Sequence, residues 1–244
     1  MNRTAARAAE IRAYCEAHAD PALVAKYYRY FKEGYDAYGV SQPLFEAGRD
    51  RFLAGWREEL GLAGFLELGD LLVRDGKYEM GSFAISFLTA FLEEFTPATF
   101  RHLGQWLAVG IGNWAHCDYL CGEVLSPCLL RGVVPTEAMA GWRVAPSRWQ
   151  RRAVPVALIK PFKKTGAIEP ALAFIEPMMG DAERVVHQGL GWMLREAWKK
   201  KPEPVEAFLM QWKDTAARLI FQYATEKMAP ERKRLFRRAP KSKF

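Results

Sequence analysis

The feature that most constrains the fold is a succession of amphipathic helical patterns along almost the whole chain. Apolar residues recur three and four apart, as at Phe83, Phe87 and Phe91, which is the spacing of one face of an α-helix. Two stretches, 132–134 and 142–144, could be extended, but both are too short to pair usefully. The sequence therefore predicts an all-α protein. The predicted helical runs are residues 22–32, 43–59, 78–95, 98–109, 148–162, 182–199 and 205–226.

Local start signals support these runs. Asp20-Pro21 and Thr96-Pro97 each place a capping side chain before a proline, which suits the first turn of a helix. Asp181 is positioned to cap the helix that follows it. These signals predict helix starts at residues 21 and 97 and shortly after 181.

Helices of this length, joined by short connections, favour antiparallel helical hairpins stacked side by side. We therefore expect an α-solenoid, or superhelix, of HEAT-like repeats that occupies residues 1–229 as a single domain. The concave face of such an array is its usual binding surface. Pro155 should kink or interrupt its run. Residues 121–145 have the weakest periodicity and are expected to form an irregular connection.

Positive charge is concentrated at the C-terminal end. The chain carries a net charge of +7, and residues 230–244 hold seven basic residues against one acid. This basic, proline-containing tail is predicted to lack fixed structure. It could be a solubilising terminus or an arm that tethers DNA, and the rest of the chain is close to neutral.

The sequence predicts a soluble, cytoplasmic protein. Its apolar runs are shorter than the roughly 20 residues of a membrane span, and its beginning does not resemble a signal peptide. Cys117 and Cys121 share a helical face next to His116, but their spacing does not match a zinc motif. We expect buried free thiols there and no metal.

Three helical segments carry candidate functional residues. Trp114 and Asp118 are four apart, so on a helix they point the same way. A packing tryptophan beside a surface or capping aspartate would be the ordinary interpretation. The other two segments are a basic ridge of Arg148, Arg151 and Arg152, and residues 189–196, in which Trp192 precedes Arg195 by three.

Taken together and in order, these segments resemble the AlkD-type DNA alkylation repair family. The resemblance extends from about residue 22 to about residue 228, and the Gly-Trp-x-Leu-Arg-Glu fragment is its most specific part. It departs from the family pattern at Ala115, at residues 187–188 and at residues 214–218. The matching fragments are Asn113-Trp114-x-x-x-Asp118, Trp149-x-x-Arg152-Ala153 and Gly191-Trp192-x-Leu194-Arg195-Glu196.

The resemblance implies a role for each matched residue. Asp118 corresponds to the catalytic carboxylate, and Trp114 and Trp192 correspond to the aromatic side chains that flank the lesion. The residues expected to contact DNA are Arg152, Arg195, Arg148 and Tyr30, with two neighbouring tyrosines as alternatives to Tyr30.

The implied activity is that of a DNA glycosylase, a hydrolase that releases N3- or N7-alkylated purines from duplex DNA. An alkylated purine is cationic and departs neutral, so a fixed carboxylate could stabilise the sugar cation without a metal or cofactor. The resemblance implies that the lesion is engaged from the backbone side, without a deep base pocket. We expect a monomer that associates with the nucleoid when bound to DNA.

Two alternatives remain open at the level of sequence. One is a non-catalytic binder of damaged or branched DNA on the same scaffold. The other is a helical-repeat module that binds proteins, which is a common use of such arrays. A basic concave face would favour DNA, and an apolar or acidic face would favour a protein partner.

Overall fold

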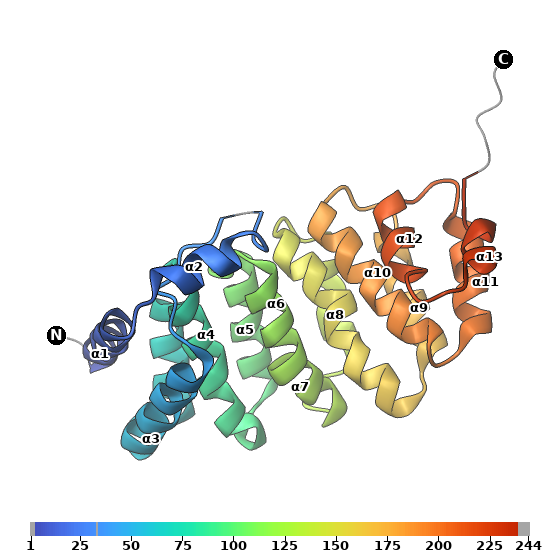
Figure 1. Ribbon diagram of the computed structural model, residues 1–244. Helices are drawn as coiled ribbons and strands as arrows, with labels where there is room; N and C mark the ends of the chain where they lie inside the picture. The colour runs from blue at the N-terminus through green and yellow to red at the C-terminus, as the bar shows by residue number, and fades with distance from the viewer. Residues whose placement is uncertain (1–2, 33, 239–244) are drawn as a thin grey trace. The chain divides into compact units, whose positions relative to one another are not determined.

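The computed structural model describes residues 3–32 and 34–238. Within these ranges, all of the regular secondary structure is helical (Figure 1). The all-α prediction is confirmed. The chain divides into two compact units, Met1–Val124 and Leu125–Phe244, which are described separately. The expectation of a single domain over residues 1–229 stays a prediction. None of the described helices is long and apolar enough to cross a membrane.

Unit 1 is built around the pairing of helices α3 (Gln42–Leu72) and α4 (Tyr78–Leu88). Helix α1 packs against α3, and helix α6 packs against α4. Its elements are α1 (Arg3–Ala17), α2 (Pro21–Tyr28), α3 (Gln42–Leu72), α4 (Tyr78–Leu88), the 3-10 helix η1 (Thr89–Glu94), α5 (Pro97–Val109) and α6 (Trp114–Leu120).

The predicted phenylalanine stripe forms the core of unit 1. Phe83, Phe87 and Phe91 are all buried, and Phe65 of α3 packs against Phe87 and Phe91 with ring centroids 5.1 and 5.2 Å apart. Helix α3 extends beyond the predicted run 43–59. The chain bends at Gly61, which has a φ of 54°, and the helix then continues to Leu72. That dihedral is unfavourable for a side chain, so the glycine provides the bend.

The predicted start signals are confirmed at two positions. Asp20 accepts a hydrogen bond from the backbone of Ala22, and Thr96 forms a reciprocal capping box with Thr99. The helix start shortly after residue 181 is also confirmed, since α10 begins at residue 184, but the capping role predicted for Asp181 is wrong because Glu183 is the N-cap. The Asp181 carboxylate instead pairs with Arg151 at 2.7 Å.

Unit 2 is centred on helix α10 (Arg184–Trp198), which packs against both α8 (Arg148–Thr165) and α12 (Arg218–Ala224). The π-helix η2 (Cys121–Leu125) leads into it from unit 1. Its further elements are α7 (Ser126–Leu130), the 3-10 helix η3 (Thr136–Val144), α8 (Arg148–Thr165), α9 (Ile168–Ile175), the 3-10 helix η4 (Glu176–Met178), α10 (Arg184–Trp198), α11 (Pro202–Trp212), α12 (Arg218–Ala224) and α13 (Pro230–Leu235).

The expected interruption at Pro155 and the expected irregular connection over residues 121–145 are wrong. Helix α8 continues through Pro155 without a break, because this proline and its neighbours Val154 and Val156 are buried, and their packing outweighs the loss of one helical hydrogen bond. The alternative of a kink at Pro155 stays a prediction. Residues 121–145 are mostly helical, in short π, α and 3-10 segments. Such short segments carry too few turns to produce a visible periodicity.

The expected lack of structure in the basic tail is also wrong for residues 230–238. Helix α13 begins at Pro230, and Phe236 is buried. Arg232 pairs with Glu206 at 2.6 Å, and Arg238 donates to the carbonyl of Ala216 at 2.8 Å. These contacts with residues earlier in unit 2 fix a segment that its composition alone would leave free. Residues 239–244 lie outside the described residues.

Candidate functional site

Helix α6 presents the predicted tryptophan–aspartate pair. Asn113 caps the helix by accepting from the backbone of His116 at 2.9 Å. Trp114 and Asp118 follow one turn apart, and both are partly exposed. Trp114 stacks on Phe31 with ring centroids 5.5 Å apart, and its indole N–H donates to the carbonyl of Tyr30 at 3.1 Å. These contacts fix the indole before any ligand arrives.

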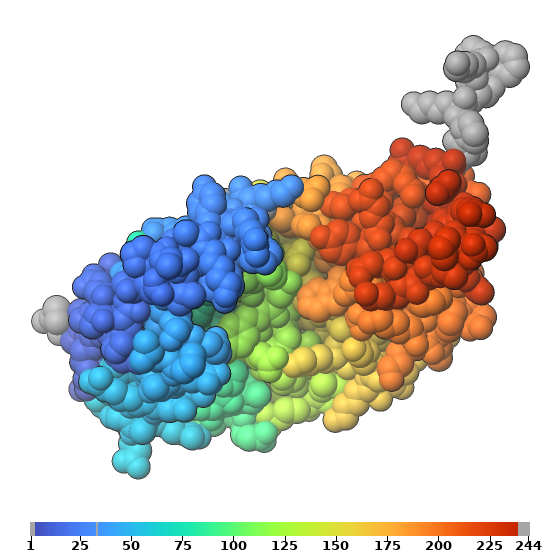
Figure 2. Space-filling view, in the orientation of Figure 1, coloured from blue at the N-terminus to red at the C-terminus, as the bar shows by residue number. Residues whose placement is uncertain are grey.

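A cavity of about 750 Å³ lies beside this helix, entirely within unit 1. Its walls come from α2, the connection after it, and the starts of α3, α4 and α6. Trp114, Ala115 and Tyr119 contribute the α6 side, so Asp118 belongs to the same short helix as three lining residues. The segment around Tyr27 and Tyr30 lies on the outside of the unit, in blue in Figure 2.

A buried carboxylate organises one wall of this cavity. Glu79, only 4% exposed, accepts hydrogen bonds from the backbone N–H groups of Tyr38, Gly39 and Val40 at 2.9, 2.8 and 3.1 Å. Gly39 has a φ of 84°, and a Cβ there would lie 2.1 Å from the carbonyl oxygen of Asp20. The sequence analysis did not identify Glu79 as a functional residue. A lone acid in an apolar helical run was the signal that could have identified it.

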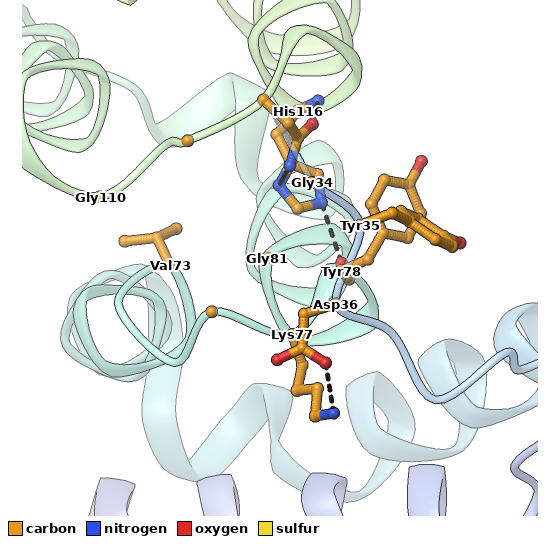
Figure 3. Close-up of a pocket in the computed structure, with 12 residues that line it drawn as sticks. Gly34, Tyr35, Asp36, Val73, Lys77, Tyr78, Gly81, Gly110 and His116 are labelled. Carbon is orange, nitrogen blue, oxygen red and sulfur yellow. Dashed lines mark hydrogen bonds and ion pairs between the residues drawn. The ribbon is translucent and has the colours of Figure 1, made fainter. Parts of the chain in front are cut away.

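A second, smaller cavity of about 360 Å³ adjoins a buried histidine (Figure 3). His116 places its Nε2 2.9 Å from the carbonyl of Tyr78 and its Nδ1 2.9 Å from the side-chain nitrogen of Asn113. These partners assign the neutral ring with its proton on Nε2. Burial lowers the pKa of His116 to about 4, although the Tyr78 carbonyl opposes the shift.

These contacts also bear on the metal alternative. Both nitrogens of His116 are engaged in hydrogen bonds, so neither is available as a ligand. Cys117 and Cys121 are buried, and neither forms a disulfide. Within the described ranges, no three His, Cys, Asp or Glu side chains are grouped so that they could hold a metal ion.

The predicted basic ridge of α8 is largely engaged inside unit 2. Arg148 lies 3.9 Å from Glu183 and Arg151 lies 2.7 Å from Asp181. Arg152 is only 5% exposed and donates to a backbone carbonyl of α10 at 2.6 Å. The ridge is therefore not a solvated basic face, and these residues connect α8 with α10 and the segment before it.

Helix α10 places Trp192 and Arg195 at partly exposed positions. The Arg195 guanidinium pairs with Glu226 and with Glu196. Burial tends to raise the pKa of Glu196, but hydrogen bonds from two lysines, Lys199 and Lys163, outweigh it and leave that pKa low. Arg195 is thus part of a charge network within the unit.

Close helix packing explains one glycine of the Gly-Trp-x-Leu-Arg-Glu fragment. A Cβ on Gly191 would lie 2.5 Å from the Cβ of Tyr223 and 2.7 Å from the carbonyl oxygen of Ile220. Only glycine allows α10 to approach α12 this closely.

The structure thus brings the predicted residues together in two groups. Tyr30, Trp114 and Asp118 belong to unit 1, where Tyr30 and Trp114 are in contact. Arg152 and helix α10, which carries Trp192 and Arg195, are in contact in unit 2. The convergence of both groups on one concave face stays a prediction.

Comparison with known proteins identifies the family. A family model described as DNA alkylation repair enzyme matches residues 11–228, and the chain belongs to that family. No curated protein matches it. The family assignment confirms the resemblance drawn from the sequence.

Solved structures show the same fold. A protein from Enterococcus faecalis, described as a predicted DNA alkylation repair enzyme, is 15% identical with a TM-score of 0.75, over 87% of this chain and 98% of that one. AlkD2 from Streptococcus mutans is 20% identical with a TM-score of 0.57, over 76% and 90% of the two chains. The protein smu.31 from Streptococcus mutans UA159 is 18% identical with a TM-score of 0.57, over 75% and 92%. These likenesses confirm the predicted helical-repeat fold.

Proposed function

We propose that this protein is a DNA glycosylase that hydrolyses the N-glycosidic bond of N3- or N7-alkylated purines in duplex DNA. Membership of the DNA alkylation repair family supports this proposal. The observation that carries it is the pair Trp114 and Asp118, which lie one turn apart on α6, with Trp114 lining an aromatic cavity. A fixed indole and a carboxylate are both suited to a cationic nucleotide.

The proposed reaction needs one carboxylate. The bond between C1′ and the purine nitrogen breaks with its electron pair moving onto the base, which leaves neutral because it was already cationic. Positive charge then develops on the sugar, where the Asp118 carboxylate would stabilise it. Water adds to C1′ and loses a proton, which completes hydrolysis. No strong general acid is required, because the leaving group does not need protonation.

The remaining site residues would position the DNA. Trp114, held by Phe31 and by the Tyr30 carbonyl, would lie against the damaged nucleotide. In unit 2, Trp192 is the second aromatic residue proposed to contact the DNA. Arg148, Arg152, Arg195 and Tyr30 would contact or support the backbone. Since Arg195 pairs with Glu226, a phosphate at this position would have to replace a carboxylate partner.

The substitution Asp118→Asn tests the proposal. It removes the charge from a nearly isosteric side chain, so single-turnover excision from methylated duplex DNA should fall about 10²–10³-fold. Binding of the same duplex should be nearly unchanged, since the charge matters most in the transition state. Asp50→Asn, at an exposed position of α3 beside Arg49, is the matched control. Excision at the wild-type rate by Asp118→Asn would show that Asp118 is not the catalytic group.

The arginine pairing in unit 2 favours a second candidate. If Arg148, Arg151 and Arg195 keep their carboxylate partners, they contribute little to phosphate binding. The scaffold could then serve as a non-catalytic module. Wild-type protein that binds methylated duplex without excision would be a damaged-DNA binder. Protein that does neither would be better explained as a protein-interaction module.

A further inference from the structure

Two lysines and an arginine converge on one buried carboxylate in unit 2. Glu196 of α10 is only 7% exposed. Its Oε1 accepts hydrogen bonds from Lys199 at 2.7 Å and from Arg195 at 3.3 Å, and its Oε2 accepts one from Lys163 at 3.1 Å. Lys163 belongs to α8, so a single carboxylate holds together three cations from α8 and from the end of α10.

The parallel course of α8 and α10 brings these cations together. Near the starts of the two helices, Arg152 donates to the carbonyl of Val185. Near their ends, Lys163 donates to Glu196. The helices therefore lie side by side and run in the same direction (Figure 1). The side chains of Lys163 and Lys199 are 44% and 43% exposed at this shared end, so both ammonium groups face solvent above the buried carboxylate.

This cluster carries more positive than negative charge. Arg195 also pairs with Glu226, which in turn pairs with Lys227. These contacts join four cations to two carboxylates, so the network of described residues keeps an excess of two positive charges. An ammonium group has three N–H donors, and each of the two lysines gives one of them to Glu196. The other donors can bind an anion without displacing that carboxylate.

The cluster lies on the same face of α10 as Trp192. Arg195 and Lys199 follow Trp192 by three and seven residues, which is the spacing of one helix face. Under the proposed function, a strand that contacts Trp192 would carry its neighbouring phosphates past these cations. Lysines in the last turn of a helix also complement the helix dipole, but that role requires neither a shared carboxylate nor an excess of charge.

We propose that Lys163, Lys199 and Arg195 form a binding site for backbone phosphates of duplex DNA, held together by the carboxylate of Glu196. The inference rests on the proposed function for DNA as the partner, and it adds two lysines that the sequence analysis did not identify. Phosphate contacts position a protein on DNA but do not read its bases. The site should therefore act on undamaged and alkylated duplexes alike.

The salt dependence of binding to an undamaged DNA duplex tests this site without requiring catalysis. Fluorescence anisotropy at a series of salt concentrations gives the slope of log K against log salt, which is about 0.9 per phosphate contact. The double substitution of Lys163→Gln with Lys199→Gln should make this slope shallower by at least about 0.9. Replacing both lysines by arginine keeps the charge and should keep the wild-type slope.

The next lysine along the chain from each of these two provides the matched control. Lys164 and Lys200 are exposed, and neither is among the described residues that donate to Glu196. Replacing both by glutamine removes the same charge from the same helix ends, and it should change the slope by less than half as much. Equal effects of the two double substitutions would overturn the phosphate site, as would a wild-type protein that does not bind the duplex. The glycosylase proposal fails separately, if wild-type protein excises no alkylated base while the two double variants still differ in slope.

Discussion

The substitution Glu79→Gln should destabilise unit 1 although it changes the side chain by a single group. One carboxylate oxygen accepts from Gly39 and Val40 at 2.8 and 3.1 Å, and the other accepts from Tyr38 at 2.9 Å. A glutamine can keep only one of these oxygens. If its oxygen keeps Gly39 and Val40, its NH₂ group faces the N–H of Tyr38, and two donors then oppose each other.

The expected magnitude follows from these three hydrogen bonds. One is lost and leaves a partly buried donor unsatisfied, at a cost of about 1–3 kcal/mol, and two become bonds to a neutral acceptor, each weaker by about 1 kcal/mol. Relief from burying a charge offsets part of this loss. We expect the free energy of unfolding to fall by about 2–4 kcal/mol.

Urea denaturation followed by circular dichroism measures the effect. The midpoint of the transition that reports unit 1 should move to lower urea with an unchanged slope. Glu46→Gln is the control, because Glu46 is exposed and accepts a hydrogen bond from Gln42 one turn away. A loss below about 0.5 kcal/mol, the usual size of a surface effect, would refute the view that Glu79 anchors residues 38–40.

Three further predictions follow from other contacts. Because the pKa of His116 falls from 6.5 to about 4 on folding, the unfolded chain takes up a proton between these pH values. The free energy of unfolding should therefore be highest above pH 6.5 and decline toward pH 4. In urea denaturation at a series of pH values, His116→Gln should make this decline smaller. Gly191→Ala should lower the free energy of unfolding by about 1–3 kcal/mol through overpacking. Thermal denaturation would measure this loss, with Gly141→Ala as the control, because a Cβ on Gly141 meets open space and should leave the stability unchanged. Arg152→Ala should lower the stability by about 1–3 kcal/mol, because its guanidinium is buried; unchanged stability with weaker DNA binding would instead indicate a direct backbone contact.

The sequence by itself determined the local structure. Helix starts at Pro21 and Pro97 could be predicted because a cap and its helix lie within four residues of each other. The placement of Trp114 and Asp118 one turn apart on a helix was equally local. The order of the three matching fragments was enough to suggest the family, since it needs no knowledge of how the helices pack.

Only the tertiary structure decided what surrounds these residues. Trp114 meets the carbonyl of Tyr30, 84 positions away, and Glu79 meets Gly39, 40 positions away, so neither contact has a local signature. The same holds for residues 230–238 of the basic tail. Their composition predicts disorder, but Arg232 pairs with Glu206 and Phe236 is buried. Periodicity reports which face of a helix is apolar, but the partner of that face depends on how distant segments pack. Charge balance and burial therefore became visible only in the folded chain.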